Sequence, residues 1–309
     1  MALPADRTSQ ATGRPLIGIA LVLASAASLA AAPTAAKLAL DSGGNTLTVV
    51  ALRSAIGAAL MGLLLAGSRQ RFGVGRATLM RCLYAGLFYA VTTYGFIGSV
   101  AYIPVSVAVP ILFTHPIIVA VLSHWRGGER LTRRKLALAL AALAGIALVL
   151  GPESGNLDPV GIGLAALAAA AASGMILFAA RAQEAATNTQ ANFHMTAVAV
   201  AALVAATVAG DAWSFPSGAV GWLGLAGAGV GITVGFLAFF AAFRHIGPVR
   251  ATMLGTVEPL FSTLFAVAVL DERLGPWQWS GVVLVVVALG LFEAPERDRR
   301  PGNAARGGP

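Results

Sequence analysis

Two ionisable side chains stand directly before prolines within long apolar stretches of the sequence. Glu258 lies in GTVEPLF, residues 255–261, and His115 lies in FTHPIIV, residues 113–119. A carboxylate is costly in hydrocarbon, so Glu258 should face the protein interior or water and be either paired or protonated. This chemistry suits a carrier of protons or cations. The alternative is a structural partner for Arg53 or for a neighbouring backbone group.

The second ionisable residue, His115, also allows two interpretations. An imidazole can change charge near neutral pH, whereas a neutral core histidine would simply bind a backbone carbonyl. The prolines that follow, Pro116 and Pro259, lack the N–H that the carbonyl one helical turn earlier would accept. We therefore expect a kink in each helix. The freed carbonyls could bind a polar substrate, water or a neighbouring helix.

Two basic residues also fall within apolar stretches. Arg53 lies about two turns inside its stretch, where it could bind a substrate carboxylate through two hydrogen bonds or form a structural ion pair. Lys37 lies near the end of an earlier stretch. It could contribute to binding, or extend its ammonium group towards the interface beside Asp41.

Smaller polar residues and glycines complete the candidate residues. Tyr89 and Thr93 belong to a segment that holds all four tyrosines of the chain. They could line a path with hydrogen-bonding groups, or be packing residues. Gly227, Gly231 and Gly235 recur at every fourth position, a spacing that gives one smooth helix face for close packing.

Composition indicates the environment in which these residues must be positioned. The chain is 57% hydrophobic and only 11% charged, with a mean hydropathy of +0.79, whereas a soluble protein has roughly a quarter charged residues. Apolar stretches of about 20 residues recur, which is the length of a membrane-spanning helix. Strands of a membrane barrel would instead alternate over about 10 residues. We predict an all-α polytopic membrane protein.

The charge and cysteine content exclude other classes. A net charge of +8 is explained by arginine-rich cytoplasmic loops, so nucleic acid is not an expected partner. The only cysteine, Cys82, excludes an intramolecular disulfide and a cysteine-clustered metal site. We expect no metal and no cofactor.

Polar breaks and turn residues predict ten spans. These are residues 16–36, 46–66, 79–98, 104–123, 134–151, 159–180, 192–209, 218–240, 249–269 and 276–293. The first could instead be a signal peptide, because residues 24–26 (Ala-Ser-Ala) resemble a cleavage site. Residues 1–14 and 294–309 are rich in Arg, Gly and Pro, and we expect disordered tails there.

Basic residues set the orientation of these spans. With the N-terminus inside, nearly all of the 21 Lys and Arg residues fall in inside segments, and only Arg273 falls in an outside loop. Cytoplasmic loops carry this excess of basic residues. We therefore predict a multi-pass protein of the cytoplasmic (inner) membrane with both termini in the cytoplasm.

An internal repeat divides the chain in two. The segment THPIIVAVLSHWRGGERL at 114–131 aligns with VEPLFSTLFAVAVLDERL at 257–274, at a constant offset of 143 residues (116 to 259, 129 to 272). The predicted halves, 15–151 and 152–293, each hold five spans. Because five is odd, the halves must have opposite orientations. Inverted repeats of this kind are typical of secondary transporters, whose substrate site lies near the midplane.

With these motifs the sequence resembles the EamA-type ten-helix transporters of the drug/metabolite transporter superfamily. The resemblance rests on AAKLAL, ALRSAIGAAL, GGERLT and LDERLG, and covers about residues 15–293. It implies export or exchange of small metabolites, often amino acids or drugs, across the inner membrane. The stretch TVEPLF is similar to one in amino-acid exporters of this type, which does not assign a substrate. His115 departs from the family, whose first repeat usually carries an uncharged residue there.

The leading hypothesis is a secondary transporter of a small polar metabolite that works by alternating access, with protons as a candidate coupling ion. The nucleotide-binding pattern GxxxxGK[ST] is absent, and so are the hydrolase patterns HExxH and GxSxG. We therefore expect no enzyme. A non-transporting scaffold or sensor is the alternative class. Arg53 for a carboxylate and Glu258 for an amine suggest a zwitterionic substrate, bound by a monomer or homodimer in the bilayer.

Overall fold

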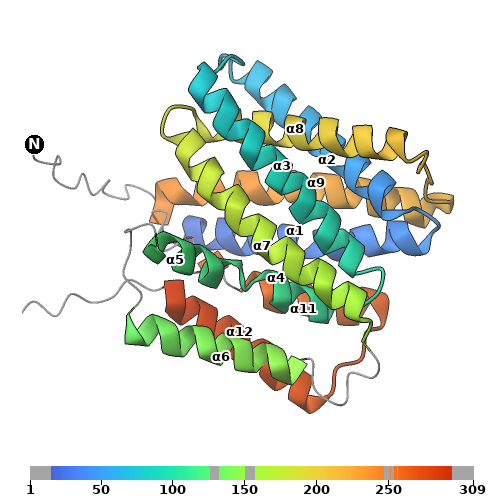
Figure 1. Ribbon diagram of the computed structural model, residues 1–309, viewed down its shortest axis with the longest axis vertical. Coiled ribbons are helices and arrows are strands. Elements are labelled where there is room, and N and C mark those ends of the chain that lie inside the picture. Colours follow the sequence, from blue (N-terminus) through green and yellow to red (C-terminus); the bar gives the residue numbers. More distant parts are fainter. Residues whose placement is uncertain are drawn as a thin grey trace, which may run out of the picture.

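The computed structural model describes residues 15–125, 132–149, 157–246, 251, 254, 255 and 257–293, and every regular element in these ranges is a helix. The first half of the chain forms α1 to α6, and the second half forms α7 to α12 (Figure 1). The helices are α1 (Pro15–Asp41), α2 (Thr46–Gly67), α3 (Arg76–Ser99), α4 (Val105–Leu112), α5 (His115–Trp125), α6 (Arg133–Val149), α7 (Pro159–Gln183), α8 (Asn188–Ala209), α9 (Gly218–Ile246), α11 (Glu258–Leu270) and α12 (Pro276–Glu293).

Five described helices are long and apolar enough to cross a membrane, namely α1, α2, α7, α8 and α9 over Gly218–Phe239. Shorter apolar helices accompany them, including α11 and most of α12. Their length and composition agree with the predicted class, an all-helical polytopic membrane protein. The leucines and valines that remain exposed on these helices, such as Leu63, Leu223 and Val287, are what a lipid-facing surface requires.

The predicted span 104–123 is not one helix. It divides into α4 and α5, which a turn at Phe113 and Thr114 separates. Since Pro116 is the second residue of α5, its missing N–H falls in the first turn, where no helical partner exists for it. Instead of the predicted kink inside a helix, the proline therefore stands at a helix start.

One end of the bundle is closed by hydrogen bonds between connections of the two halves. The backbone N–H of Ser217 donates to the carbonyl of Ser42 at 2.8 Å, and Ser214 Oγ donates to the carbonyl of Gly43 at 2.7 Å. The loop between α1 and α2 thus lies against the loop between α8 and α9.

The opposite end holds the α2–α3 and α7–α8 connections. Thr187 Oγ1 lies 2.8 Å from Gln70 Oε1, and the Arg81 guanidinium forms an ion pair with Glu184 at 3.2 Å. Helix connections therefore alternate between the two ends, as they must in helices that cross a membrane in succession (Figure 1). This second end carries a group of arginines, comprising Arg69, Arg71, Arg81 and Arg181.

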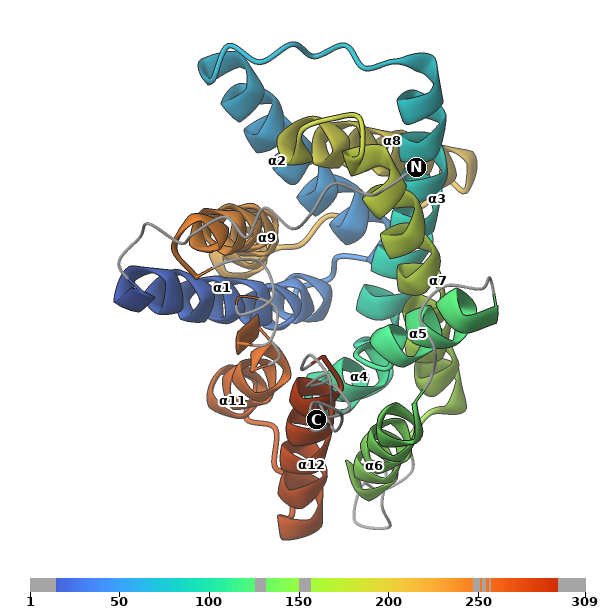
Figure 2. The ribbon, with the colours of Figure 1, turned by 90° about the vertical axis from the view of Figure 1, so that its left-hand side faces the viewer.

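The contacts between the two halves are symmetric, because each helix pair has a counterpart in which the two halves have changed places. If α1, α2, α3, α4–α5 and α6 are equated in order with α7, α8, α9, α11 and α12, the α1–α9 pair corresponds to α7–α3, and α2–α9 corresponds to α8–α3. The contact of α1 with α11 corresponds to that of α7 with α4 and α5, while α2–α8, α6–α12 and α4–α11 are their own counterparts. Figure 2 shows α1 between α9 and α11.

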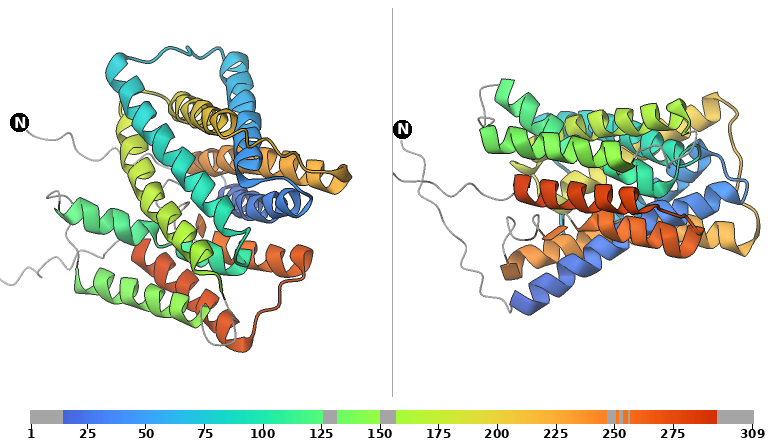
Figure 3. Two further views of the ribbon diagram at one scale, coloured as in Figure 1. Left: turned by 45° about the vertical axis from the view of Figure 1, so that its right-hand side comes forward. Right: turned by 90° about the horizontal axis from the view of Figure 1, so that it is seen from below.

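Small residues permit the closest of these approaches. A Cβ added at Gly281 of α12 would lie 2.6 Å from the Gly145 carbonyl oxygen of α6, and one at Gly145 would lie 2.8 Å from Val285. Only glycine allows the two backbones to come this close. The two helices lie side by side at the far end of the molecule from α2 and α8 (Figure 3, left).

Candidate functional site

A narrow cavity of about 20 Å³ lies between α2 and α3 of the first half and α8 and α9 of the second. We call it the Arg53 cavity. Its polar lining comprises Arg53, Ser54, Tyr89, Asn192, Thr196 and Thr233. Its apolar lining includes Met61, Met195, Ile232 and Phe236. This volume holds about one water molecule.

Arg53 is the only charged residue among the described residues that line this cavity. It lies seven residues, or roughly 10 Å, from the start of α2, and its side chain is only 5% exposed. The guanidinium donates a hydrogen bond from Nη2 to Thr93 Oγ1 of α3. Within the described part of the chain it forms no ion pair, and its buried Nε has no hydrogen-bond partner.

The next residue of α2 adds a second unsatisfied donor. Ser54 is 4% exposed, and its Oγ also lacks a hydrogen-bond partner among the described residues. Buried polar groups without partners are rare because their desolvation is not compensated. Two of them on consecutive residues beside one cavity make this the candidate binding site.

The structure therefore brings together three of the predicted site residues. Thr93 is buried and binds Arg53 directly, and Tyr89, one helical turn earlier on α3, lines the cavity. The other tyrosines, Tyr84, Tyr94 and Tyr102, are all exposed by more than a third. The predicted tyrosine-lined path is thus reduced to Tyr89 in this cavity.

Close packing of α9 on α2 fixes the cavity wall. A Cβ at Gly229 would lie 2.8 Å from Ile56 Cβ and 3.0 Å from the Arg53 carbonyl oxygen. One turn further, Thr233 Oγ1 donates to the Gly229 carbonyl at 3.1 Å. A glycine at 229 therefore lets the second half approach the backbone that carries the arginine.

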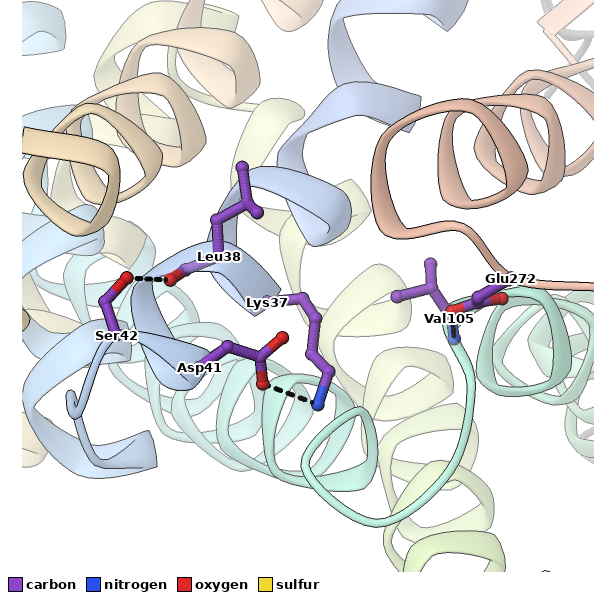
Figure 4. Close-up of polar contacts among 6 residues, drawn as sticks. All are labelled: Lys37, Leu38, Asp41, Ser42, Val105 and Glu272. Atoms are coloured by element: carbon purple, nitrogen blue, oxygen red, sulfur yellow. Dashed lines mark hydrogen bonds and ion pairs between the residues drawn. The ribbon is translucent and has the colours of Figure 1, made fainter.

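Lys37 lies in a separate, open pocket of about 460 Å³, which we call the Lys37 pocket. Its ammonium group forms an ion pair with Asp41 at 2.9 Å, one turn later on α1 (Figure 4). The lining also includes Tyr102, Asp271 and Glu272. This contact is the partnership with Asp41 that the spacing suggested, and it sets Lys37 apart from the Arg53 cavity.

Glu272 connects the halves at the Lys37 pocket. Its carboxylate accepts hydrogen bonds from the backbone N–H of Val105 at 2.7 Å and of Ser106 at 3.1 Å, and from Ser106 Oγ at 2.5 Å. Figure 4 shows it at the first residues of α4. A carboxylate there satisfies free N–H groups and complements the positive end of the helix dipole. The second half thus caps a helix of the first.

His115 is the first residue of α5 and does not line the Arg53 cavity. Its Nδ1 lies 3.1 Å from the Leu112 carbonyl, a contact that requires the tautomer with a proton on Nδ1. Leu112 is the last residue of α4, so the imidazole meets a carbonyl at a helix C-terminus, where helical donors end. The His115 carbonyl in turn accepts a hydrogen bond from Ser173 of α7 at 3.2 Å. The imidazole thus has the backbone carbonyl partner that a structural histidine would need.

Glu258 begins α11, with Pro259 in the first helical turn. The sequence had suggested a position near the middle of a helix spanning 249–269, and the helix start at Glu258 corrects this. The side chain is partly exposed and makes no hydrogen bond or ion pair within the described residues. It does not line the Arg53 cavity. His115 and Glu258 nonetheless occupy equivalent places, since each begins a helix and precedes its proline.

The three predicted packing glycines face α1. A Cβ at Gly235 would lie 2.5 Å from Leu29 Cγ, and one at Gly231 would lie 3.0 Å from the Ser28 carbonyl oxygen. At Gly227 the nearest atom, Ala35 Cβ, would be at an ordinary 3.7 Å. The stripe therefore lies on the α1–α9 contact, tightly at two positions and loosely at the third.

Sequence reasoning missed part of the cavity lining and the cap. Asn192 and Thr196 are one turn apart on α8, and Thr233 stands alone on α9. The signal that could have found them is an isolated polar residue inside an apolar span. Glu272 was noted only as part of a repeated loop motif, and its role depends on which helix lies opposite.

The described part of the chain is thus a helical membrane protein whose two halves enclose a buried cation. The chain belongs to the EamA-like transporter family, whose model matches residues 16–151 and again residues 159–293. This match confirms the resemblance to the drug/metabolite transporter superfamily.

A comparison with solved structures shows the same fold. One solved chain, titled only "Crystal structure of protein", superposes with a TM-score of 0.63 over 90% of this chain and 96% of that chain, at 19% sequence identity. At this identity the similarity indicates a shared fold and nothing about function. No protein of curated function matches the sequence significantly.

Proposed function

We propose that the protein is a secondary transporter that exports or exchanges a small polar metabolite across the cytoplasmic membrane by alternating access. Membership of a transporter family supports the class. The observation that carries the site is Arg53, a buried cation without a described ionic partner, beside a cavity to which both halves contribute. A charge inside a membrane bundle is costly unless it has a function or a partner.

The proposal includes ten membrane spans, arranged as inverted five-helix repeats over residues 15–151 and 152–293, with both termini in the cytoplasm. The symmetric exchange of helix pairs supports two repeats. The arginines at the end that holds the α2–α3 and α7–α8 connections favour that end as cytoplasmic. Two halves of opposite orientation, with a shared site between them, suit a rocking motion that exposes the site to each side in turn.

Protons are the coupling ion in this proposal, and Glu258 is their candidate carrier. Glu258 is a partly buried residue whose carboxylate has no partner within the described residues. A group of this kind can gain and lose a proton without breaking an ion pair. Its separation from the Arg53 cavity gives the proton and the substrate different binding places.

Flux in proteoliposomes tests the proposal. Vesicles containing the purified protein are loaded with a defined mixture of amino acids, short monocarboxylates, amines and nucleosides, and efflux of each compound is followed by mass spectrometry. We expect selective efflux of one class. The variant Arg53→Lys should reduce it strongly, because an ammonium group cannot reproduce the planar guanidinium donors.

The matched control is Arg71→Lys, which alters an exposed arginine between α2 and α3. It should leave efflux unchanged. A scaffold or sensor would release no compound faster than empty vesicles do, and that result would refute the transporter. Equal efflux from the Arg53→Lys and wild-type proteins would instead remove Arg53 from the site.

A further inference from the structure

We infer that the Arg53 cavity binds a small monocarboxylate, and that it prefers this anion to the amino acid with the same carbon skeleton. The inference rests on the proposed function, because it names the substrate class of the same site. It also differs from the zwitterion that the sequence suggested.

The charge of the cavity carries the first step. The described residues that line it include one cation, Arg53, and no acidic side chain. A bound monoanion would make the site neutral, whereas a zwitterion would leave its positive charge uncompensated and an amine would double it. Uncompensated charge is disfavoured in a buried, water-poor environment. The arithmetic therefore favours a monoanion.

Glu258 does not lie where it could bind the ammonium group of a substrate in the Arg53 cavity. Glu258 was the candidate partner for such a group, yet it is not among the described residues that line the cavity. The remaining polar groups, on Tyr89, Asn192, Thr196 and Thr233, are neutral. They can hydrogen-bond to a ligand but cannot balance a second positive charge.

Two donors without partners are available to hydrogen-bond the oxygens of a carboxylate. Arg53 Nε and Ser54 Oγ are buried, lack partners in the described part of the chain, and belong to residues that line the cavity. Thr93 binds Nη2 and so holds the guanidinium in place. Charge-assisted bonds to a carboxylate are among the strongest hydrogen bonds that proteins form.

The apolar wall determines what the rest of the ligand can be. Met61, Met195, Ile232 and Phe236 offer no polar atoms to a ligand apart from weakly accepting sulfur. The volume of about 20 Å³ admits a ligand only if these side chains move. The two methionines are unbranched and adapt readily to new shapes. A short aliphatic body attached to the carboxylate fits this wall.

Binding to the purified full-length protein in lipid nanodiscs tests the inference with matched probes. Sodium propionate and alanine share a carbon skeleton and differ by the amino group, while propylammonium chloride and sodium chloride report on cations and on simple anions. We expect propionate to bind at least about tenfold more tightly than alanine by calorimetry. Arg53→Lys should weaken propionate binding by about tenfold or more, and Arg71→Lys should not change it.

Ser54→Ala provides a milder variant that removes one donor and little volume. It should weaken propionate binding severalfold while the unfolding temperature stays close to that of the wild type. Alanine binding as tightly as propionate would overturn the inference. So would displacement of propionate by propylammonium, or binding of chloride as tight as that of propionate, since the site would then recognise charge alone.

Failure of this inference is distinguishable from failure of the proposed function. If propionate does not bind but Arg53-dependent efflux of another compound persists, the transporter stands and the monocarboxylate is wrong. If propionate binds through Arg53 but no compound crosses the vesicle membrane, the binding site stands and transport is wrong.

Discussion

Removing the Glu272 carboxylate should loosen the N-terminus of α4. The carboxylate accepts three hydrogen bonds from Val105 and Ser106. A hydrogen bond to a charged group contributes about 1.5–3 kcal/mol, and the loss of a helix cap costs about 0.5–2 kcal/mol. The three bonds share one carboxylate and are not additive, so we expect Glu272→Ala to cost about 2 kcal/mol. Glu272→Gln keeps one acceptor oxygen and should cost about half as much.

Local opening at α4 gives the assay. Val107, in the first turn of α4, is only 1% exposed, so a cysteine introduced there reacts with a maleimide only when the helix start opens. A loss of about 2 kcal/mol corresponds to a roughly thirtyfold increase in the open population and in labelling rate. The protein's own cysteine, Cys82, is fully buried and is replaced by serine to give a single reporter.

Asp271→Asn is the matched control, because Asp271 is the adjacent exposed carboxylate of the same pocket. Its backbone is left-handed, with φ of 54°, a conformation that asparagine tolerates. The control should label at the unaltered rate. Equal labelling rates in Glu272→Ala and in the unaltered protein would refute the reasoning, and so would an increase of the same size in Asp271→Asn.

Three further predictions concern packing, protonation and topology. Gly235→Ala should lower the free energy of unfolding by about 1–3 kcal/mol, because its Cβ would meet Leu29 at 2.5 Å. The control Gly227→Ala should be close to neutral, and equal unfolding temperatures of the two variants would contradict this prediction. Glu258→Gln should give normal folded yield but flux with a flattened pH dependence, because the amide cannot take up a proton; unchanged pH-dependent flux would exclude Glu258 as the proton carrier. A reporter fused after residue 130 should read cytoplasmic and one fused near residue 213 external, and a cytoplasmic signal at 213 would contradict the proposed topology.

Helices were predictable where an apolar stretch follows a recognisable cap. The sequence placed helix starts at 46 and 159, and α2 and α7 begin at Thr46 and Pro159. The preceding Asn45 and Asp158 each accept a backbone hydrogen bond at 2.8 Å, as helix N-caps do. At both helices, the start of the apolar stretch and the capping side chain therefore indicate the same helix start.

Helix starts with a polar first turn were harder to predict. The start of α8 was expected at 192, yet the helix begins at Asn188, because Thr187 and Gln190 form a capping box that hydropathy does not detect. The break before His115 was likewise missed, since an apolar stretch looks the same whether one helix or two run through it. A proline fits either a kink or a first turn.

The partners of buried polar residues could not be predicted from the sequence. Arg53, Tyr89 and Thr93 were all identified as candidates, but the contact between Arg53 and Thr93 depends on how α2 and α3 rotate about their axes. That rotation is fixed by packing with the second half, including the approach of Gly229 to α2. The Glu272 cap could not be predicted for the same reason, because its acceptor lies 166 and 167 residues from its donors along the chain.

The symmetric exchange of helix pairs has a consequence for the origin of the site. Two identical five-helix chains inserted in opposite directions would pack as the two halves do here, but every residue of such a dimer would occur twice about the axis. Joining the copies in one gene removes that constraint. Residues 195–197, the counterparts of Arg53 in α8, are Met, Thr and Ala. A duplicated chain can therefore hold a single guanidinium where an ancestral homodimer would have placed two repelling ones.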